Sequence, residues 1–176
     1  FLKQNPGSLP PTATEKAKLC QLYSLLELKP TILLCKDPNR VTFLTQLFLD
    51  TCTSAFANTK TLLHNTTRKT KRSYILGHPS QTSTPISEAL KEALASSRKT
   101  SKKSSNTTII AFQGYLKSSW FSAFQGVFDL NVLTFSNGER ISIAPNVRFL
   151  FGTSSDELKE SLPLYYFGKC AIVHVE

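Results

Sequence analysis

A nucleotide phosphate-binding loop is the first chemistry that this sequence indicates, in the stretch TILLCKDPNRVT over residues 31–42. The apolar run from Thr31 predicts a buried strand, the polar residues around Pro38 predict a turn, and the apolar periodicity from Phe43 predicts a helix. Strand, turn and helix form the frame on which phosphate-binding loops carry the pattern GxxxxGK[ST]. The stretch therefore has the layout of a nucleotide site.

The residues that fill this frame differ from those of a working phosphate-binding loop. The two glycines, the lysine and the hydroxyl residue of the pattern fall, in that order, on Cys35, Arg40, Val41 and Thr42. Glycine lets backbone N–H groups close around phosphate without a Cβ in the way, and lysine brings positive charge to the terminal phosphates. Val41 brings no charge, whereas Thr42 keeps an oxygen that can bind magnesium. We therefore expect these positions to mark a degenerate nucleotide site.

No other group of residues has the spacing of a catalytic or metal site. The histidines at positions 64, 78 and 174 stand apart, and the acidic residues show no paired-carboxylate arrangement. The cysteines are also far apart and contain no CxxC pair, which argues against zinc and against a disulfide framework in a chain of this size. We expect reduced, buried thiols at Cys20, Cys35, Cys52 and Cys170.

Strands and helices alternate along the predicted chain, as in an α/β fold with a mainly parallel sheet. Apolar periodicity, a capping Thr12 or Thr14 and a following proline predict a first helix over residues 13–28. Asn137 and Gly138 between two β-rich runs predict an inserted hairpin. Further strands are predicted at residues 73–76, 108–112, 147–151 and 170–175. Further helices are predicted at residues 84–94, 116–128 and 155–162.

Length and composition indicate one folded domain that can bury a core. The chain has 176 residues, of which 40% are hydrophobic and 10% aromatic. We expect an extended lead-in over residues 1–12, one α/β domain over residues 13–176 and a flexible basic loop over residues 95–107. The first residue is Phe1 and no methionine occurs, which we interpret as a segment of a longer polypeptide. No apolar run reaches the ~20 residues that a membrane helix needs.

Positive charge is concentrated in two places in a chain whose formal net charge is +9. The clusters lie at residues 68–72 and 98–103, and such clusters bind acidic partners. The second lies in a Ser/Thr/Lys-rich stretch without interleaved aromatic residues, which favours a solvated loop over a nucleic-acid surface. We do not expect nucleic-acid binding, and a basic protein-interaction module stays open as an alternative function.

The C-terminal part of the chain, residues 109–176, carries an ordered set of motifs. The set begins with the strand-like run IIAFQG, the following Trp120 and the segment FDLN. It continues with NGERI, then with APNVRFLF, and closes with KCAIVH. In this order and spacing, the set resembles the ATPase modules of dynein heavy chains, which are AAA+ proteins. The N-terminal half is similar to that family by its layout alone.

The resemblance implies the P-loop NTPase-like α/β fold of an AAA+ large subdomain. In that fold the sheet is mainly parallel, has five strands ordered 5-1-4-3-2, carries helices on both faces and receives an inserted β-hairpin. A helical lid completes the nucleotide site in the family and is not part of this segment. The resemblance thus adds strand order to what the alternating elements predict.

The chemical positions of that family are eroded here. The acidic residue of the Walker B motif falls on Gln113, whose neutral amide lacks the charge that helps to hold magnesium. The polar sensor position falls near Gly152 and Thr153. The arginine that reaches a neighbouring module's phosphates falls on Lys169, which keeps the charge but loses the bidentate fork. We therefore expect no ATP hydrolysis, no catalytic residue, no metal and no firmly held cofactor.

The expected function is that of a structural and coupling module in a dynein-heavy-chain-like, microtubule-associated protein. The family implies neighbouring AAA+ modules of the same chain, microtubules, and dynein-associated or axonemal proteins as partners. It also implies a cytoplasmic and cytoskeletal location, in a cilium or sperm flagellum. A module that binds ATP or ADP without turnover, through Arg40 and Thr42, stays open as an alternative beside the basic interaction module.

Overall fold

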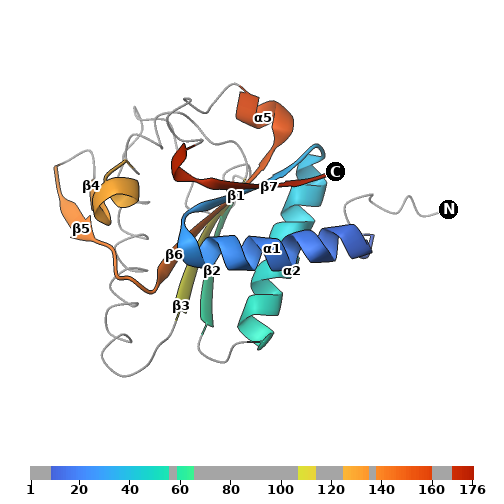
Figure 1. The fold of residues 1–176 in the computed structure, drawn as a ribbon, viewed down its shortest axis with the longest axis horizontal. Coiled ribbons are helices and arrows are strands. Elements are labelled where there is room, and N and C mark those ends of the chain that lie inside the picture. Colours follow the sequence, from blue (N-terminus) through green and yellow to red (C-terminus); the bar gives the residue numbers. More distant parts are fainter. Residues whose placement is uncertain (1–8, 56–58, 66–106, 114–124, 135–137, 160–167) are drawn as a thin grey trace.

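A computed structural model describes the chain outside residues 1–8, 56–58, 66–106, 114–124, 135–137 and 160–167 (Figure 1). The helices are α1 (Ala13–Leu28), α2 (Pro38–Ala55) and α5 (Ser155–Lys159), and residues 125–130 are also helical. The strands are β1 (Thr31–Cys35), β2 (Thr59–Asn65), β3 (Thr107–Gln113), β4 (Val132–Thr134), β5 (Arg140–Ser142), β6 (Val147–Ser154) and β7 (Ala171–Val175).

The main sheet has five parallel strands in the order β2-β3-β6-β1-β7. Numbered among themselves along the chain and read from β7, these strands have the order 5-1-4-3-2. The antiparallel pair β4-β5 lies between β3 and β6 in the sequence and forms a separate sheet. The chain therefore has a P-loop NTPase-like α/β fold, with a parallel five-stranded main sheet and an inserted hairpin, in the strand order that the resemblance implies.

Apolar side chains alternate along the strands, so that the sheet buries a cluster on each face. Leu33 of β1 and Leu150 of β6 point to one face and pack against α1 and α2. Ile32 and Phe151 point to the other face, where helical residues 125–130 and the hairpin cover them. In Figure 1 the hairpin lies at the left of the view, away from α1 and α2. Helices therefore cover both faces.

Helix α1 has the limits that its sequence predicts, because both of its ends are specified locally. The Thr12 hydroxyl accepts a hydrogen bond from the Glu15 backbone N–H at 3.2 Å, and the Glu15 carboxylate accepts one from the Thr12 N–H at 2.7 Å. These reciprocal bonds form a capping box. At the other end the backbone becomes extended at Lys29, directly before Pro30. A proline disfavours helical geometry in the residue before it.

Helix α2 begins earlier than the sequence analysis predicts, at Pro38 instead of Phe43. Asp37 is its N-cap: the backbone oxygen accepts from the Val41 N–H at 3.0 Å, and Oδ1 accepts from the Asn39 N–H at 2.9 Å. Proline is well suited to the first helical position, because its missing N–H would have no partner there. The dipeptide Asp37-Pro38 thus starts a helix and does not form a free turn.

Strand β2 lies in a stretch where no strand is predicted from the sequence. The strand TKTLLHN has few apolar residues, and it lies at the edge of the sheet, where polar residues are tolerated. The predicted strand at residues 73–76, the predicted helix at 84–94, both basic clusters and almost all of the basic loop at 95–107 lie outside the described residues.

The hairpin prediction is confirmed in the described residues. Leu133 pairs with Ile141 and Thr134 pairs with Arg140, and Gly138 has a φ of 81°, a value that glycine adopts without strain. Of the predicted helix at 116–128, residues 125–128 are helical and the rest lies outside the described residues. No helix in the described part of the chain is long and apolar enough to cross a bilayer.

Candidate functional site

The parallel sheet gathers most of the predicted nucleotide-site positions at one edge. Cys35, the last residue of β1, pairs with Ser154 of β6, and Gln113, the last residue of β3, pairs with Gly152. These residues lie at the carboxyl ends of their strands, where open α/β sheets bind ligands. Lys169 lies at the opposite edge, two residues before the first residue of β7. The phosphate-loop, Walker B and sensor positions therefore lie together at the carboxyl edge of the sheet, whereas Lys169 lies at its amino-terminal edge.

The connection between β1 and α2 is too short to wrap around a phosphate. The predicted loop extends from Cys35 to Arg40, but α2 starts at Pro38, so that Lys36 and Asp37 alone join strand and helix. The Asp37 carboxylate also accepts the Asn39 N–H at the helix N-terminus. A phosphate bound at this helix N-terminus would need the same backbone N–H groups as hydrogen-bond donors. It would also be repelled by the negative charge of the Asp37 carboxylate beside them.

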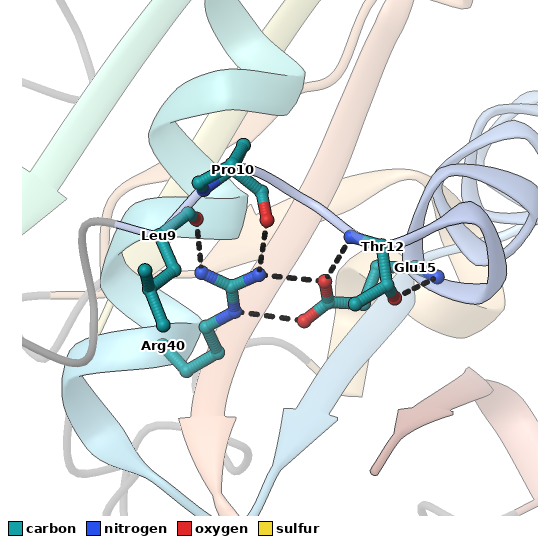
Figure 2. A network of polar contacts seen from close by, with 5 residues as sticks. All are labelled: Leu9, Pro10, Thr12, Glu15 and Arg40. Carbon is teal, nitrogen blue, oxygen red and sulfur yellow. Dashed lines mark hydrogen bonds and ion pairs between the residues drawn. The ribbon is translucent and has the colours of Figure 1, made fainter.

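Arg40 contacts the start of α1 and the residues before it (Figure 2). Its Nε and Nη2 donate to the two Glu15 carboxylate oxygens at 2.7 and 2.6 Å, which is a bidentate pair. Its Nη1 donates to the Leu9 carbonyl oxygen at 2.5 Å, and Nη2 also donates to the Pro10 oxygen at 3.3 Å. We call Leu9, Pro10, Thr12, Glu15 and Arg40 the Arg40 clasp.

The clasp is a largely buried ion pair whose charges are paired within the protein. The side chains of Arg40 and Glu15 are 12% and 6% exposed. The hydrogen bonds from Arg40 lower the pKa of Glu15 from 4.5 to about 2, against the opposing effect of burial. The pKa of Arg40 is raised, chiefly by its hydrogen bond to Glu15. Its guanidinium also lies 5.0 Å from the centre of the Phe43 ring. Arg40 therefore joins α2 to the start of α1.

Val41, at the lysine position of the phosphate loop, is part of the core. It is 2% exposed and packs against Gly152 of β6. A Cβ built on Gly152 would lie 2.6 Å from the Thr45 hydroxyl oxygen and 3.2 Å from a Val41 methyl carbon. Glycine is required here because α2 approaches the strand too closely for any side chain. The sensor position is therefore used for helix packing.

The two remaining polar positions of the candidate site also lack the required chemistry. Thr42 is exposed, and its hydroxyl donates to the Pro38 carbonyl oxygen at 2.9 Å, a bond within the helix. Gln113 is 2% exposed and carries no charge. Among the described residues, no three His, Cys, Asp or Glu side chains gather in a way that could hold a metal. These residues do not fit a magnesium nucleotide bound as in a phosphate loop.

Lys169, at the arginine position of the family, is already paired. Its Nζ lies 2.6 Å from Oδ1 of Asp129, and the two side chains are 40% and 32% exposed. All four cysteines are free thiols, and three are buried as predicted, whereas Cys20 is exposed. Burial raises the pKa of Cys52 to about 11 and that of Cys170 to about 12, so these thiols are structural.

Glu15 is not among the predicted site residues, although the sequence carries a signal for it. Thr12 followed three residues later by Glu15 has the spacing of a capping box, which predicts one of its roles. Its second role, as the partner of Arg40, depends on tertiary structure. Comparison of the chain with protein-family models and with curated proteins finds no match in either. The fold and the geometry of the site therefore carry the functional argument.

Proposed function

We propose that this chain is a structural and coupling module of the AAA+ type that does not hydrolyse ATP. Two observations support the proposal. One is the strand order 5-1-4-3-2, and the other is that side chains at the carboxyl edge of the sheet are already used in contacts within the protein. An ATPase of this type needs a phosphate loop, a lysine and an acidic residue at that edge. In this chain the phosphate loop is replaced by a two-residue connection. The lysine is replaced by the buried Val41, and the acidic residue is replaced by the neutral Gln113.

The observation that carries the proposal is the pairing of Arg40 with Glu15. Arg40 is the residue at the site best suited to replace a missing phosphate-binding lysine. Its Nε and both terminal nitrogens already donate to the Glu15 carboxylate and to two backbone carbonyl oxygens. A phosphate would have to displace this buried, bidentate partner. The side chain that would bind nucleotide instead stabilises the domain.

The wider setting of the module rests on the motifs of residues 109–176. Their order supports a dynein-heavy-chain-like parent protein in which this domain packs between neighbouring AAA+ modules. In that setting the parent protein associates with microtubules and with axonemal proteins, in the cytoskeleton of a cilium or sperm flagellum. The module would then transmit conformational changes between its neighbours and leave hydrolysis to other modules.

Two substitutions in the full-length protein separate a structural role from a nucleotide-binding role. Thr42→Ala removes the hydroxyl that a magnesium nucleotide would need, at an exposed position. Arg40→Ala removes the clasp. The structural proposal predicts that Thr42→Ala leaves co-sedimentation with microtubules unchanged and that Arg40→Ala reduces it. Equal loss in both variants, with Thr42→Ala as stable as wild type, would favour a functional nucleotide site instead.

A further inference from the structure

A cleft opens at the amino-terminal edge of the sheet, away from the junction of β1 and α2. Its volume is about 370 Å³, within the range of sites for small ligands. Its described walls come from four parts of the chain: the α1–β1 connection, residues 127–131, the residues leading into β6, and Lys169. The cleft thus lies where separate segments converge on the starts of β1 and β6.

Positive charge predominates among the residues that line this cleft. Three cations, Lys29, Arg148 and Lys169, line it, and Glu27 is the one anion among its described lining residues. Lys29 is exposed, and Lys169 is paired with Asp129 at 2.6 Å. Glu27 and Asp129 together leave one of these three positive charges uncompensated, which favours an anionic ligand.

Arg148 is held in place by the protein, and its contact with a carboxylate is long. Its Nη1 donates to the carbonyl oxygens of Pro145 and Val147. Its Nη2 lies 3.4 Å from the carboxylate of Glu27, which is 41% exposed, so that this pair is loose. Its Nε is buried and has no hydrogen-bond partner among the described residues. The guanidinium is therefore preorganised, and its weakest contact is the one that an incoming anion would replace.

Apolar side chains, among them Val127, Phe128 and Phe149, form part of the remaining wall, together with the polar Asn131. We propose that this cleft binds a phosphomonoester that carries a flat apolar body. An arginine and a lysine in the wall of one cleft suit a doubly charged phosphate better than a single carboxylate, and the apolar side chains suit an aromatic ring. This inference does not depend on the proposed function, because it concerns the opposite edge of the sheet.

Calorimetric titration of the protein with phenyl phosphate tests the proposal. Inorganic phosphate, which lacks the ring, and benzoate, which carries one charge, serve as comparison ligands. We expect saturable binding of phenyl phosphate, with an affinity at least about tenfold higher than that of either comparison ligand. Equal affinity for phenyl phosphate and inorganic phosphate would contradict the apolar part of the proposal. Equal affinity for phenyl phosphate and benzoate would contradict its phosphate part.

Two substitutions with opposite expected effects on affinity make the test specific to the cleft. Arg148→Gln should weaken phenyl phosphate binding by about tenfold, the loss of one charge-assisted contact. Glu27→Gln should strengthen binding by about threefold, because it removes the competing carboxylate. A purely structural role for the pair predicts no gain from Glu27→Gln. Lys16→Gln, which removes an exposed charge from α1 outside this cleft, is the matched control and should leave the affinity unchanged.

The proposal fails if phenyl phosphate shows no saturable binding up to about 10 mM, or if Arg148→Gln and Lys16→Gln bind it equally well. Should Arg148→Gln unfold, Lys29→Gln at an exposed position replaces it and should weaken binding by about threefold. An unchanged affinity in a folded Lys29→Gln variant would overturn the assignment of the cleft as the site.

Discussion

The two ends of α1 each hold an arginine through a glutamate, and the two pairs differ in every respect that decides their use. At the start of the helix, Glu15 and Arg40 make a bidentate contact of 2.6–2.7 Å with side chains that are 6% and 12% exposed. At the end, Glu27 and Arg148 approach to 3.4 Å, and their side chains are 41% and 23% exposed. The first pair is closed to ligands, whereas the second lies in the wall of a cleft.

This difference shows that the presence of an arginine near a potential site does not define its role. A buried, bidentate pair cannot release one partner without leaving an uncompensated charge, which costs about 3–5 kcal/mol. A loose, partly exposed pair contributes about 0–1 kcal/mol and exchanges partners with little loss. The arginine at the expected nucleotide edge therefore stabilises the fold, whereas the loose pair at the opposite edge is consistent with the anion site that we propose there.

The largest effect is expected from breaking the first pair. Arg40→Ala should lower the free energy of unfolding by about 3–5 kcal/mol, since Glu15 would keep a buried charge without its partner. Arg148→Ala should lower it by about 1 kcal/mol or less. Urea unfolding followed by circular dichroism measures both values. Equal losses in the two variants would remove the distinction between the pairs.

Restoring the lysine of the phosphate loop is the next test. Val41→Lys should destabilise the protein by about 3 kcal/mol, because a buried valine is replaced by a charged side chain. Asn39→Lys, at an exposed position of the same helix, is the matched control and should change stability by about 0.5 kcal/mol or less. We expect neither variant to gain ATP binding. Tight ATP binding by Val41→Lys would show that the edge retains the geometry of a phosphate site.

A smaller effect tests the packing of α2 on the sensor position. Gly152→Ala should cost about 2 kcal/mol, because the added Cβ would overlap the Thr45 hydroxyl. Thr45→Ala removes that hydroxyl and should recover much of the loss in the double variant. Thermal unfolding of the two single variants and the double variant measures this coupling. Strictly additive losses would mean that the two residues do not meet as described.

The smallest expected effect is the decrease in the free energy of unfolding at low pH. The pKa of Glu15 is lowered by folding from 4.5 to about 2, so its contribution is complete above its unfolded pKa and is lost as the pH falls towards 2. At about pH 3.5 the loss should be about 1.5 kcal/mol relative to neutral pH. Glu15→Gln should abolish this component, whereas Glu27→Gln should retain it. An unchanged acid profile in Glu15→Gln would contradict the strength of the clasp.

Local signals in the sequence predict much of the fold. The limits of α1 follow from a capping box and a proline, and the hairpin follows from Asn137-Gly138. The early start of α2 was also encoded, because an aspartate before a proline is a favoured N-cap. Strand β2 escapes prediction because an edge strand needs few apolar residues.

The roles of the candidate residues could not be predicted in the same way. Arg40 and Glu15 are 25 positions apart, and their meeting depends on how α1 and α2 pack on the sheet. The cleft draws its walls from four separate segments, so no stretch of sequence carries its signature. The sequence motifs predict positions that the fold brings to the carboxyl edge of the sheet, and only tertiary contacts show how those side chains are used.

The most direct test of the central claim is the titration of a fluorescent ATP analogue into the protein, with and without magnesium. A polypeptide extended through the helical lid that the AAA+ resemblance implies should be titrated beside it, so that a missing wall is not confused with an eroded site. We predict no saturable binding at the carboxyl edge up to about 1 mM nucleotide in a protein shown to be folded. Binding with a dissociation constant of about 1 μM, abolished by Thr42→Ala and retained in Arg148→Gln, would contradict the account.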